Sequence, residues 1–272
     1  MLRTRVITAL VMLLVFSSAV FLFSATGWMA FVAVITGCAA WEWAGFCRWQ
    51  PSVRYGYGVA TAVAAFVLAY CVDTAAPSTA YGFHLLVFGV SILFWGLIGS
   101  AWLARMWPLG QGARAALTGL VVMLPTAIAM VFLRQINPWW LLGAMAIVWV
   151  ADIAAYFSGR ALGRRKLAPS ISPGKSWEGV YGALMAVVAY GLIVLSWSGA
   201  RFSPAAWGGI VLGLLALTGV SVVGDLFESM LKRQAGIKDS SQLLPGHGGV
   251  LDRIDSLTST LPMVALFVLL TR

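Results

Sequence analysis

The sequence predicts an all-α, polytopic integral membrane protein with about nine transmembrane helices. Two observations predict it. Of the 272 residues, 61% are hydrophobic and only 10% are charged, whereas a soluble domain carries roughly 25% charged residues. A chain of this length could not bury so much apolar surface in one soluble core. The apolar residues also recur in runs close to the roughly 20 residues that a membrane-spanning helix needs.

Nine apolar runs are candidate spans, and eight spans would remain an alternative because some runs are short or contain a polar residue. The first run follows Arg3 and Arg5 and resembles a signal peptide. It is long for such a segment and lacks a clear cleavage site, so we expect it to be retained as a span. The predicted spans are residues 6–23, 27–47, 56–72, 83–104, 115–133, 138–158, 179–199, 204–224 and 255–271.

The basic residues predict the orientation of the chain. With nine spans, 15 of the 18 Lys and Arg residues fall in segments on the N-terminal side of the membrane and three on the other side. Lys and Arg concentrate in cytoplasmic loops. We therefore expect a cytoplasmic N-terminus, and we attribute the net charge of +9 to this bias rather than to a nucleic-acid partner.

The polar chemistry concentrates in the second half of the chain. We expect one integral membrane unit, in which residues 1–135 are nearly pure membrane sequence and residues 136–272 carry the catalytic helices and cytoplasmic loops. Seven of the nine acidic residues lie between 152 and 255. Carboxylates near a span are costly unless they are paired, bound to metal or facing water. Their proximity to several Lys and Arg residues suggests a site for metal and phosphate.

The first motif lies at the end of the eighth predicted span. If the helix continues past residue 224, then Asp225, Glu228, Ser229 and Lys232 lie at i, i+3, i+4 and i+7 and share one face. Oxygen ligands suit Mg²⁺, and a Lys suits a phosphate. The alternative is a solvated helix end stabilised by pairs of opposite charge.

The second motif is the glycine-rich run 245–249 and the start of the last span. The run cannot form a regular helix, and its glycines let backbone N–H groups approach an anion closely. The alternative is a turn followed by a capped helix, since Asp is favoured near a helix N-terminus. That alternative explains one Asp, but not why Arg253 enters the span together with Asp252 and Asp255.

The stretch 229–255 carries a family resemblance. Its sequence follows the pattern S-x-L-K-R-x4-K-D-x-S-x2-L-P-x-H-G-G-V-x-D-R-I-D. This pattern resembles the signature of the phosphatidate cytidylyltransferase family, also called CDP-diacylglycerol synthases, at every constrained position. A pattern of this length is far more specific than a single glycine motif.

The resemblance extends more weakly over the rest of the chain. In the segment 172–179, Gly174 stands where many family members have a second Lys, and Ser176 stands where they have Thr. We therefore assign no phosphate contact to position 174, and Lys175 remains the candidate there. The other similar segments are residues 2–9, 42–44 and 152–160.

The resemblance implies an enzyme that transfers CMP from CTP to phosphatidic acid and releases CDP-diacylglycerol and pyrophosphate, in phospholipid biosynthesis. Such transfer depends on positioning and charge neutralisation more than on covalent help. It further implies Mg²⁺, with room for a second cation, a homodimer, and a multi-pass location in a bacterial cytoplasmic membrane. The active site would face the cytoplasm, where CTP is found.

The resemblance also implies roles for individual residues. His247 could assist pyrophosphate departure, contact phosphate or hold the loop, and Asp152 could instead be a polar packing residue. The cations are not divided between CTP and the lipid headgroup. The candidate catalytic residues are Asp225, Asp252, Lys232 and His247; the candidate substrate-binding residues are Lys175, Arg233, Lys238, Gly248, Gly249, Arg253 and Asp152; and the candidate metal ligands are Asp225 and Asp252, with Glu228 and Asp255 either binding the ion or supporting them.

Three other classes of protein compete with this interpretation. A transporter or channel would distribute its acidic residues through the bilayer depth and contain inverted repeats, and neither is evident here. A related enzyme acting on another lipid, such as a polyprenol kinase, is disfavoured by the signature. A non-catalytic membrane scaffold gives no reason for clustered carboxylates.

Overall fold

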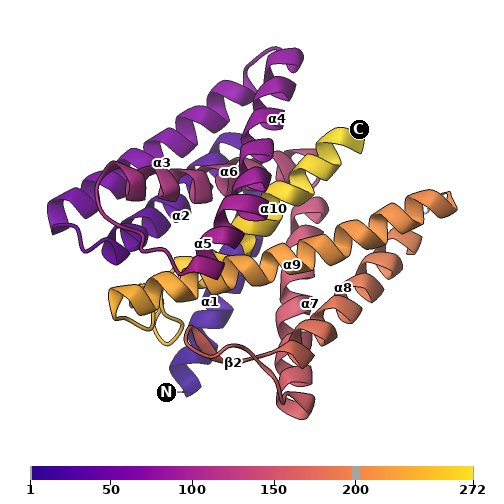
Figure 1. Cartoon of the computed structure of the whole chain (residues 1–272). Helices are drawn as coiled ribbons and strands as arrows, with labels where there is room; N and C mark the ends of the chain where they lie inside the picture. Colours follow the sequence, from indigo (N-terminus) through magenta and orange to yellow (C-terminus); the bar gives the residue numbers. More distant parts are fainter. Residues whose placement is uncertain (1, 198–202, 272) are drawn as a thin grey trace.

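The computed structural model describes residues 2–197 and 203–271. Nine helices in these two segments are long and apolar enough to cross a membrane, which confirms the predicted number of spans. The predicted end of the seventh span, at residue 199, lies outside the described residues. The helices are α1 (Leu2–Leu22), α2 (Ala25–Phe46), α3 (Pro51–Asp73), α4 (Pro77–Leu93), α5 (Ser100–Arg105), α6 (Ala113–Ile136), α7 (Pro138–Leu162), α8 (Trp177–Trp197), α9 (Pro204–Ala235) and α10 (Leu251–Thr271) (Figure 1).

Proline residues mark the starts of four of these helices. Pro51, Pro77, Pro138 and Pro204 each occupy the first turn of α3, α4, α7 and α9. Proline fits there because the first N–H groups of a helix have no partner within the helix, and its fixed φ suits the helical conformation. Helices α4 and α5 form one span, because a single π-helical segment, Phe94–Gly99, joins them.

Two boundaries differ from the hydropathy prediction in a way that matters for the site. Helix α9 continues beyond the apolar run to Ala235, and it ends at Gly236, whose φ of +75° closes the helix in the left-handed conformation that glycine favours. Helix α10 begins at Leu251, four residues before the predicted start. Both acidic motifs therefore lie on regular helix.

The polar segment between α7 and α8 is not wholly irregular. Strand β1 (Lys166–Ala168) pairs with strand β2 (Ser172–Ser176) in an antiparallel hairpin, a small β element that the all-α expectation did not include. The hairpin leads directly into α8 at Trp177. It therefore projects from the same end of the bundle as the polar ends of α7 and α8.

The core joins helices from both halves of the chain. Helix α6 is the most enclosed of the spans, whereas α1 exposes most of its apolar side chains. Buried Trp residues donate their indole N–H groups to backbone carbonyls of neighbouring helices: Trp43 to Ala115 at 3.0 Å and Trp95 to Thr258 at 3.1 Å. These bonds satisfy polar groups that would otherwise be unpaired away from water.

The first turn of α1 and the last turn of α10 lie at opposite ends of the bundle (Figure 1). The start of α1 reaches the loop between α9 and α10, because a Cβ added at Gly246 would lie 2.8 Å from Arg5 Cγ. The N-terminus and the glycine-rich loop therefore share one face of the molecule. This proximity is independent of the count of basic residues, which assigned both segments to the same side.

Candidate active site

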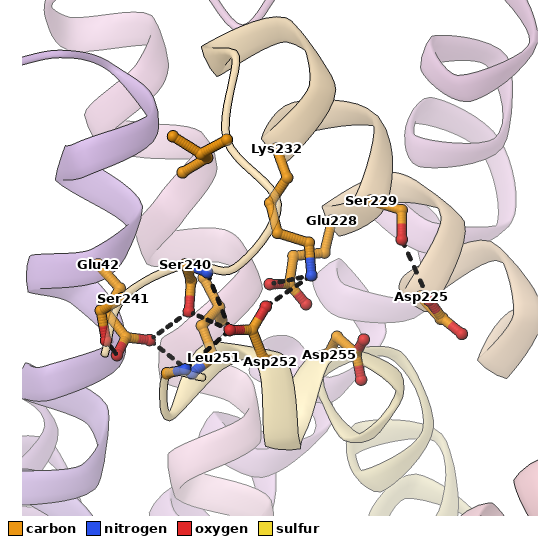
Figure 2. Close-up of polar contacts among 12 residues, drawn as sticks. Glu42, Asp225, Glu228, Ser229, Lys232, Ser240, Ser241, Leu251, Asp252 and Asp255 are labelled. Atoms are coloured by element: carbon orange, nitrogen blue, oxygen red, sulfur yellow. Dashed lines mark hydrogen bonds and ion pairs between the residues drawn. The ribbon is translucent and has the colours of Figure 1, made fainter. Parts of the chain in front are cut away.

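The acidic residues of the two motifs meet where α9 crosses α10. Asp225 and Glu228 lie on α9, and Asp252 and Asp255 lie on the first turns of α10 (Figure 2). Gly224 permits the close crossing, because a Cβ there would lie 2.5 Å from Ser259 Oγ and 3.1 Å from Asp255 O. A larger residue would push the helices apart and separate the carboxylates.

Lys232 links the two helices. Its Nζ lies 2.6 Å from Asp252 Oδ1 and 3.2 Å from Glu228 Oε1. One turn earlier on α9, Ser229 Oγ donates to Asp225 Oδ1 at 3.4 Å. The predicted shared face of α9 is thus confirmed, and its Lys lies between the carboxylates of Glu228 and Asp252.

Asp252 is held by backbone and side-chain donors as well as by Lys232. Its Oδ2 accepts hydrogen bonds from the N–H of Ser240 at 2.9 Å, from Ser240 Oγ at 2.9 Å and from the N–H of Gly249 at 2.8 Å. Gly248 has a φ of +84°, and a Cβ there would lie 2.6 Å from Asp252 Oδ2. The glycines of the loop therefore allow the backbone to close around this carboxylate.

The β hairpin supplies the second lysine of the site. Lys175, on β2, forms an ion pair with Asp225 on α9. Arg233 supports this arrangement, since its Nε donates to Ile171 O at the hairpin turn at 3.2 Å and its Nη1 donates to Ile237 O at 3.4 Å. The structure thus gives Arg233 backbone partners, and its predicted contact with substrate stays a prediction.

A cavity of about 440 Å³ adjoins the Lys175–Asp225 pair. Asp152, on α7, lines it. Most of the remaining wall is apolar or small, and it comes from α7, α8, α9, the β hairpin and the start of α10. Its lining includes Ala151, Ala155, Tyr156, Arg160, Val180, Ala183 and Ser221.

Glu42 belongs to the site, although the sequence analysis named it only within the similar segment 42–44 and not among the candidate site residues. It lies on α2, and its carboxylate accepts hydrogen bonds from Ser240 Oγ, Ser241 Oγ and the N–H groups of Val250 and Leu251 (Figure 2). Its side chain is completely buried. Two signals in the sequence pointed to it: its place in the family-like segment 42–44, and a carboxylate within an apolar run, which is costly unless it is satisfied.

The other predicted site residues of the loop and of the first turn of α10 differ in their contacts. The N–H of His247 donates to Leu244 O at 2.8 Å, and its buried Nδ1 has no hydrogen-bond partner among the described residues. The N–H of Gly249 is used by Asp252. Lys238 and Arg253 are exposed. The structure therefore places all four near the cluster or in its loop, while their contacts with substrate stay predictions.

A metal ion is not implied by the arrangement of side chains as they stand. Across residues 2–197 and 203–271, no group of three or more His, Cys, Asp or Glu side chains is placed to hold one. Asp225, Glu228 and Asp252 contact lysines instead. The donor chemistry nevertheless fits Mg²⁺, which prefers oxygen ligands. Glu228 is buried, and Lys232 is its ion-pair partner.

Comparison with known proteins identifies the family. A sequence model of the cytidylyltransferase family matches residues 3–271. The chain belongs to the cytidylyltransferase family. This member of the family is 41% identical over 276 residues to a Pseudomonas aeruginosa protein named phosphatidate cytidylyltransferase, and the alignment covers 97% of this chain and 96% of that protein.

Two further relatives carry the same name. A Haemophilus influenzae phosphatidate cytidylyltransferase is 37% identical over 289 residues, which cover 98% of both chains. A Brucella suis phosphatidate cytidylyltransferase is 48% identical over 168 residues, which cover 61% of this cytidylyltransferase family member and 60% of the relative. The similarity to the first two relatives therefore includes both the N-terminal helices and the site.

Proposed function

We propose that this chain is a CTP:phosphatidate cytidylyltransferase, which makes CDP-diacylglycerol for phospholipid biosynthesis. The observation that carries the proposal is the cluster of carboxylates and lysines at the crossing of α9 and α10, beside a cavity among membrane-length helices. Such a cluster suits a triphosphate and a lipid phosphate together. Two relatives that match nearly the whole chain bear the name of this activity.

The reaction requires one bond to form and one to break. A phosphate oxygen of phosphatidic acid attacks the α-phosphorus of CTP, and the bond from that phosphorus to the oxygen that bridges to the β-phosphorus breaks. Pyrophosphate leaves with the bridging oxygen. Because the attacking phosphate is already ionised near neutral pH, no side chain is required as a general base.

The lysines supply the positive charge that the reacting phosphates need. Lys175 lines the cavity and is the more exposed of the two, so a phosphate entering there exchanges with Asp225 as its partner. Lys232 lies between Asp252 and Glu228, and it places its charge at the base of the site. Donors that are already in place when charge develops on the phosphates contribute most to catalysis.

Asp225, Asp252, Glu228 and Asp255 are the residues that would hold Mg²⁺, and their number leaves room for a second cation. When bound, such an ion neutralises phosphate charge and aligns the reacting groups. Its binding requires Lys175 and Lys232 to leave the carboxylates that they contact in this structure. Phosphates are the partners to which these lysines would turn.

The site faces the cytoplasm in this proposal, and the chain lies in a bacterial cytoplasmic membrane. Support comes from the concentration of Lys and Arg on the N-terminal side and from the packing of Arg5 against the loop at Gly246. CTP is a cytosolic metabolite that does not cross lipid. A homodimer remains an expectation from the resemblance alone.

Phosphatidic acid reaches the site from the bilayer in this proposal. The small and apolar lining of the cavity, such as Ala155, Val180 and Ala183, is compatible with acyl chains that stay in the membrane. Single Cys residues introduced at Ala155 and Val180 are expected to lose reactivity toward a thiol reagent when phosphatidic acid is added. Equal labelling with and without the lipid would argue against this route.

The decisive experiment uses purified protein, phosphatidic acid vesicles, Mg²⁺ and CTP that is labelled at either the α- or the γ-phosphorus. Cytidylyl transfer places the α-label in the lipid extract and leaves the γ-label in the aqueous pyrophosphate. A lipid kinase gives the opposite distribution. Lipid labelling with a polyprenol or polyprenyl phosphate in place of phosphatidic acid would assign a different acceptor.

A further inference from the structure

Glu42 is a charged residue within an apolar helix. It lies in α2, and its side chain is 0% exposed. Its carboxylate reaches the loop before α10, about 200 residues further along the chain. Within the described part of the chain it forms no ion pair, so its surroundings must satisfy it entirely through hydrogen bonds.

The hydrogen bonds of Glu42 are evenly divided between its two oxygens. Oε1 accepts from Ser241 Oγ at 2.6 Å and from the N–H of Val250 at 2.9 Å. Oε2 accepts from Ser240 Oγ at 3.0 Å and from the N–H of Leu251 at 2.6 Å. The N–H groups at the start of a helix lack partners within it, so Glu42 caps α10 from another helix.

Ser240 connects Glu42 to the reacting site. Its Oγ lies 3.0 Å from Glu42 Oε2 and 2.9 Å from Asp252 Oδ2. A hydroxyl has one hydrogen to donate, so it can bond only one of the two carboxylates at a time. The backbone at Gly249 packs directly against these two side chains, because a Cβ added there would overlap both Ser240 Oγ and the Glu42 carboxylate.

We propose that Glu42 is a positioning residue that fixes the loop 238–250 and, through Ser240, sets the orientation of the Asp252 carboxylate. The inference rests on the proposed function, because that function assigns Asp252 to the reacting site. When Asp252 turns toward bound substrate, the Ser240 hydroxyl donates to Glu42 instead. The loop therefore keeps its geometry while Asp252 changes partners.

Glu42→Gln is the most direct test because it preserves size and removes one acceptor. Each oxygen of Glu42 faces one hydroxyl and one backbone N–H, so the new amide nitrogen must face an N–H that it cannot accept from. Thr36→Val is the matched control. Thr36 is buried on the same helix, but its Oγ1 bonds only its own helix, at Val32 O.

The expected result for Glu42→Gln has two parts. The kcat falls about 10- to 100-fold, as is typical when a residue that orients a ligand-binding carboxylate is lost, while the KM for CTP changes less than about threefold. Trypsin also cleaves after the exposed Lys238 several times faster, because the loop is released. Thr36→Val leaves both measurements unchanged.

Ser240→Ala separates positioning from loop stability. It deletes the bridging hydroxyl and leaves Glu42 three other donors, so we expect a kcat about tenfold lower with an unchanged rate of cleavage after Lys238. This variant also decides the question if Glu42→Gln does not fold. A wild-type kcat in Ser240→Ala would overturn the link to Asp252.

A wild-type kcat and cleavage rate in folded Glu42→Gln would overturn the role of Glu42 as a whole. Failure of the proposed function gives a different result. In that case the wild-type protein itself places no α-label in lipid, while faster trypsin cleavage in Glu42→Gln still reports on the loop.

Discussion

The two lysine–aspartate pairs of the site have the same chemistry in different surroundings. In the Lys232–Asp252 pair the side chains are 12% and 5% exposed, whereas in the Lys175–Asp225 pair they are 28% and 25% exposed. The first pair lies between two helices and a closed loop. The second joins a helix to a hairpin at the wall of a cavity.

This difference in exposure indicates that the two pairs have different roles. Asp252 accepts from two backbone N–H groups and a hydroxyl in addition to Lys232, so four donors hold its carboxylate in the free protein. Asp225 has Lys175 and Ser229 as its partners among the described residues, and its carboxylate accepts no backbone N–H there. The enclosed pair is expected to control the rate of the chemical step, and the open pair is expected to control binding.

The largest expected effect comes from the enclosed pair. In Asp252→Asn, an amide group must face Lys232 or the three donors around Oδ2, and the negative charge is lost. We expect kcat for transfer of α-label to lipid to fall on the order of 1,000-fold, the upper range for losing one preorganised polar group. Membrane insertion and purification yield should be preserved.

The same substitution at Asp73 provides the control. Asp73 ends α3 at the opposite end of the bundle, where it accepts a hydrogen bond from Gln135 Nε2 at 2.7 Å. Asp73→Asn should retain full activity. Near-wild-type turnover in Asp252→Asn would show that this residue has no part in the reaction. It would also contradict the proposed role of the Lys232–Asp252 pair.

The open pair is expected to give a different kinetic pattern. Lys175→Met removes a charge at the cavity wall, and we expect the KM for CTP or for phosphatidic acid to rise about 10- to 100-fold with a smaller change in kcat. Loss of binding that is equal in ground and transition states acts on KM. Steady-state kinetics with each substrate varied would show which phosphate it contacts.

Lys166→Met is the matched control for this variant, because Lys166 is exposed on the other strand of the same hairpin. Its KM values should equal those of the wild type. If Lys175→Met instead lowered kcat alone, the proposed division between an enclosed catalytic pair and an open binding pair would be wrong.

Gly248→Ala is expected to disturb the enclosed Lys232–Asp252 pair less than Asp252→Asn does. The residue has a φ of +84°, and the new methyl group would lie 2.6 Å from Asp252 Oδ2. A non-glycine residue in such a conformation costs about 1–3 kcal/mol. We expect a melting temperature several degrees lower and a roughly tenfold lower kcat.

Gly110→Ala separates backbone strain from contact with Asp252. Gly110 also has a positive φ, +76°, but nothing lies within 4 Å of an added Cβ. It should lower the melting temperature without affecting kcat. Equal kcat values in the two variants would show that the loop does not press on Asp252.

The smallest effect is expected at Arg233. Its guanidinium holds backbone carbonyls at Ile171 and Ile237, so Arg233→Lys and Arg233→Gln should both raise the KM about three- to tenfold through a looser hairpin. A direct contact between Arg233 and a substrate phosphate predicts a different pattern of KM values. In that case Arg233→Lys, which keeps the charge, would be close to wild type while Arg233→Gln would not.

Local sequence properties determined most of the fold. Nine spans could be predicted because apolar composition and length are sufficient to place a helix in a bilayer. The shared face of Asp225, Glu228 and Lys232 followed from helical spacing alone. The hydropathy signal ended α9 too early, at residue 224, because the helix continues through polar residues that pair with one another.

Only the tertiary structure decided how distant segments complete the site. Helical spacing relates residues a few positions apart, and it carries no information about contacts across 50 or 200 residues. The pairing of Lys175 with Asp225, the use of Arg233 by the hairpin and the arrival of Glu42 at the α10 N-terminus all depend on helix packing. The sequence by itself determined which groups were available for phosphate chemistry, and the packing of α2, α9 and α10 decided which of them meet.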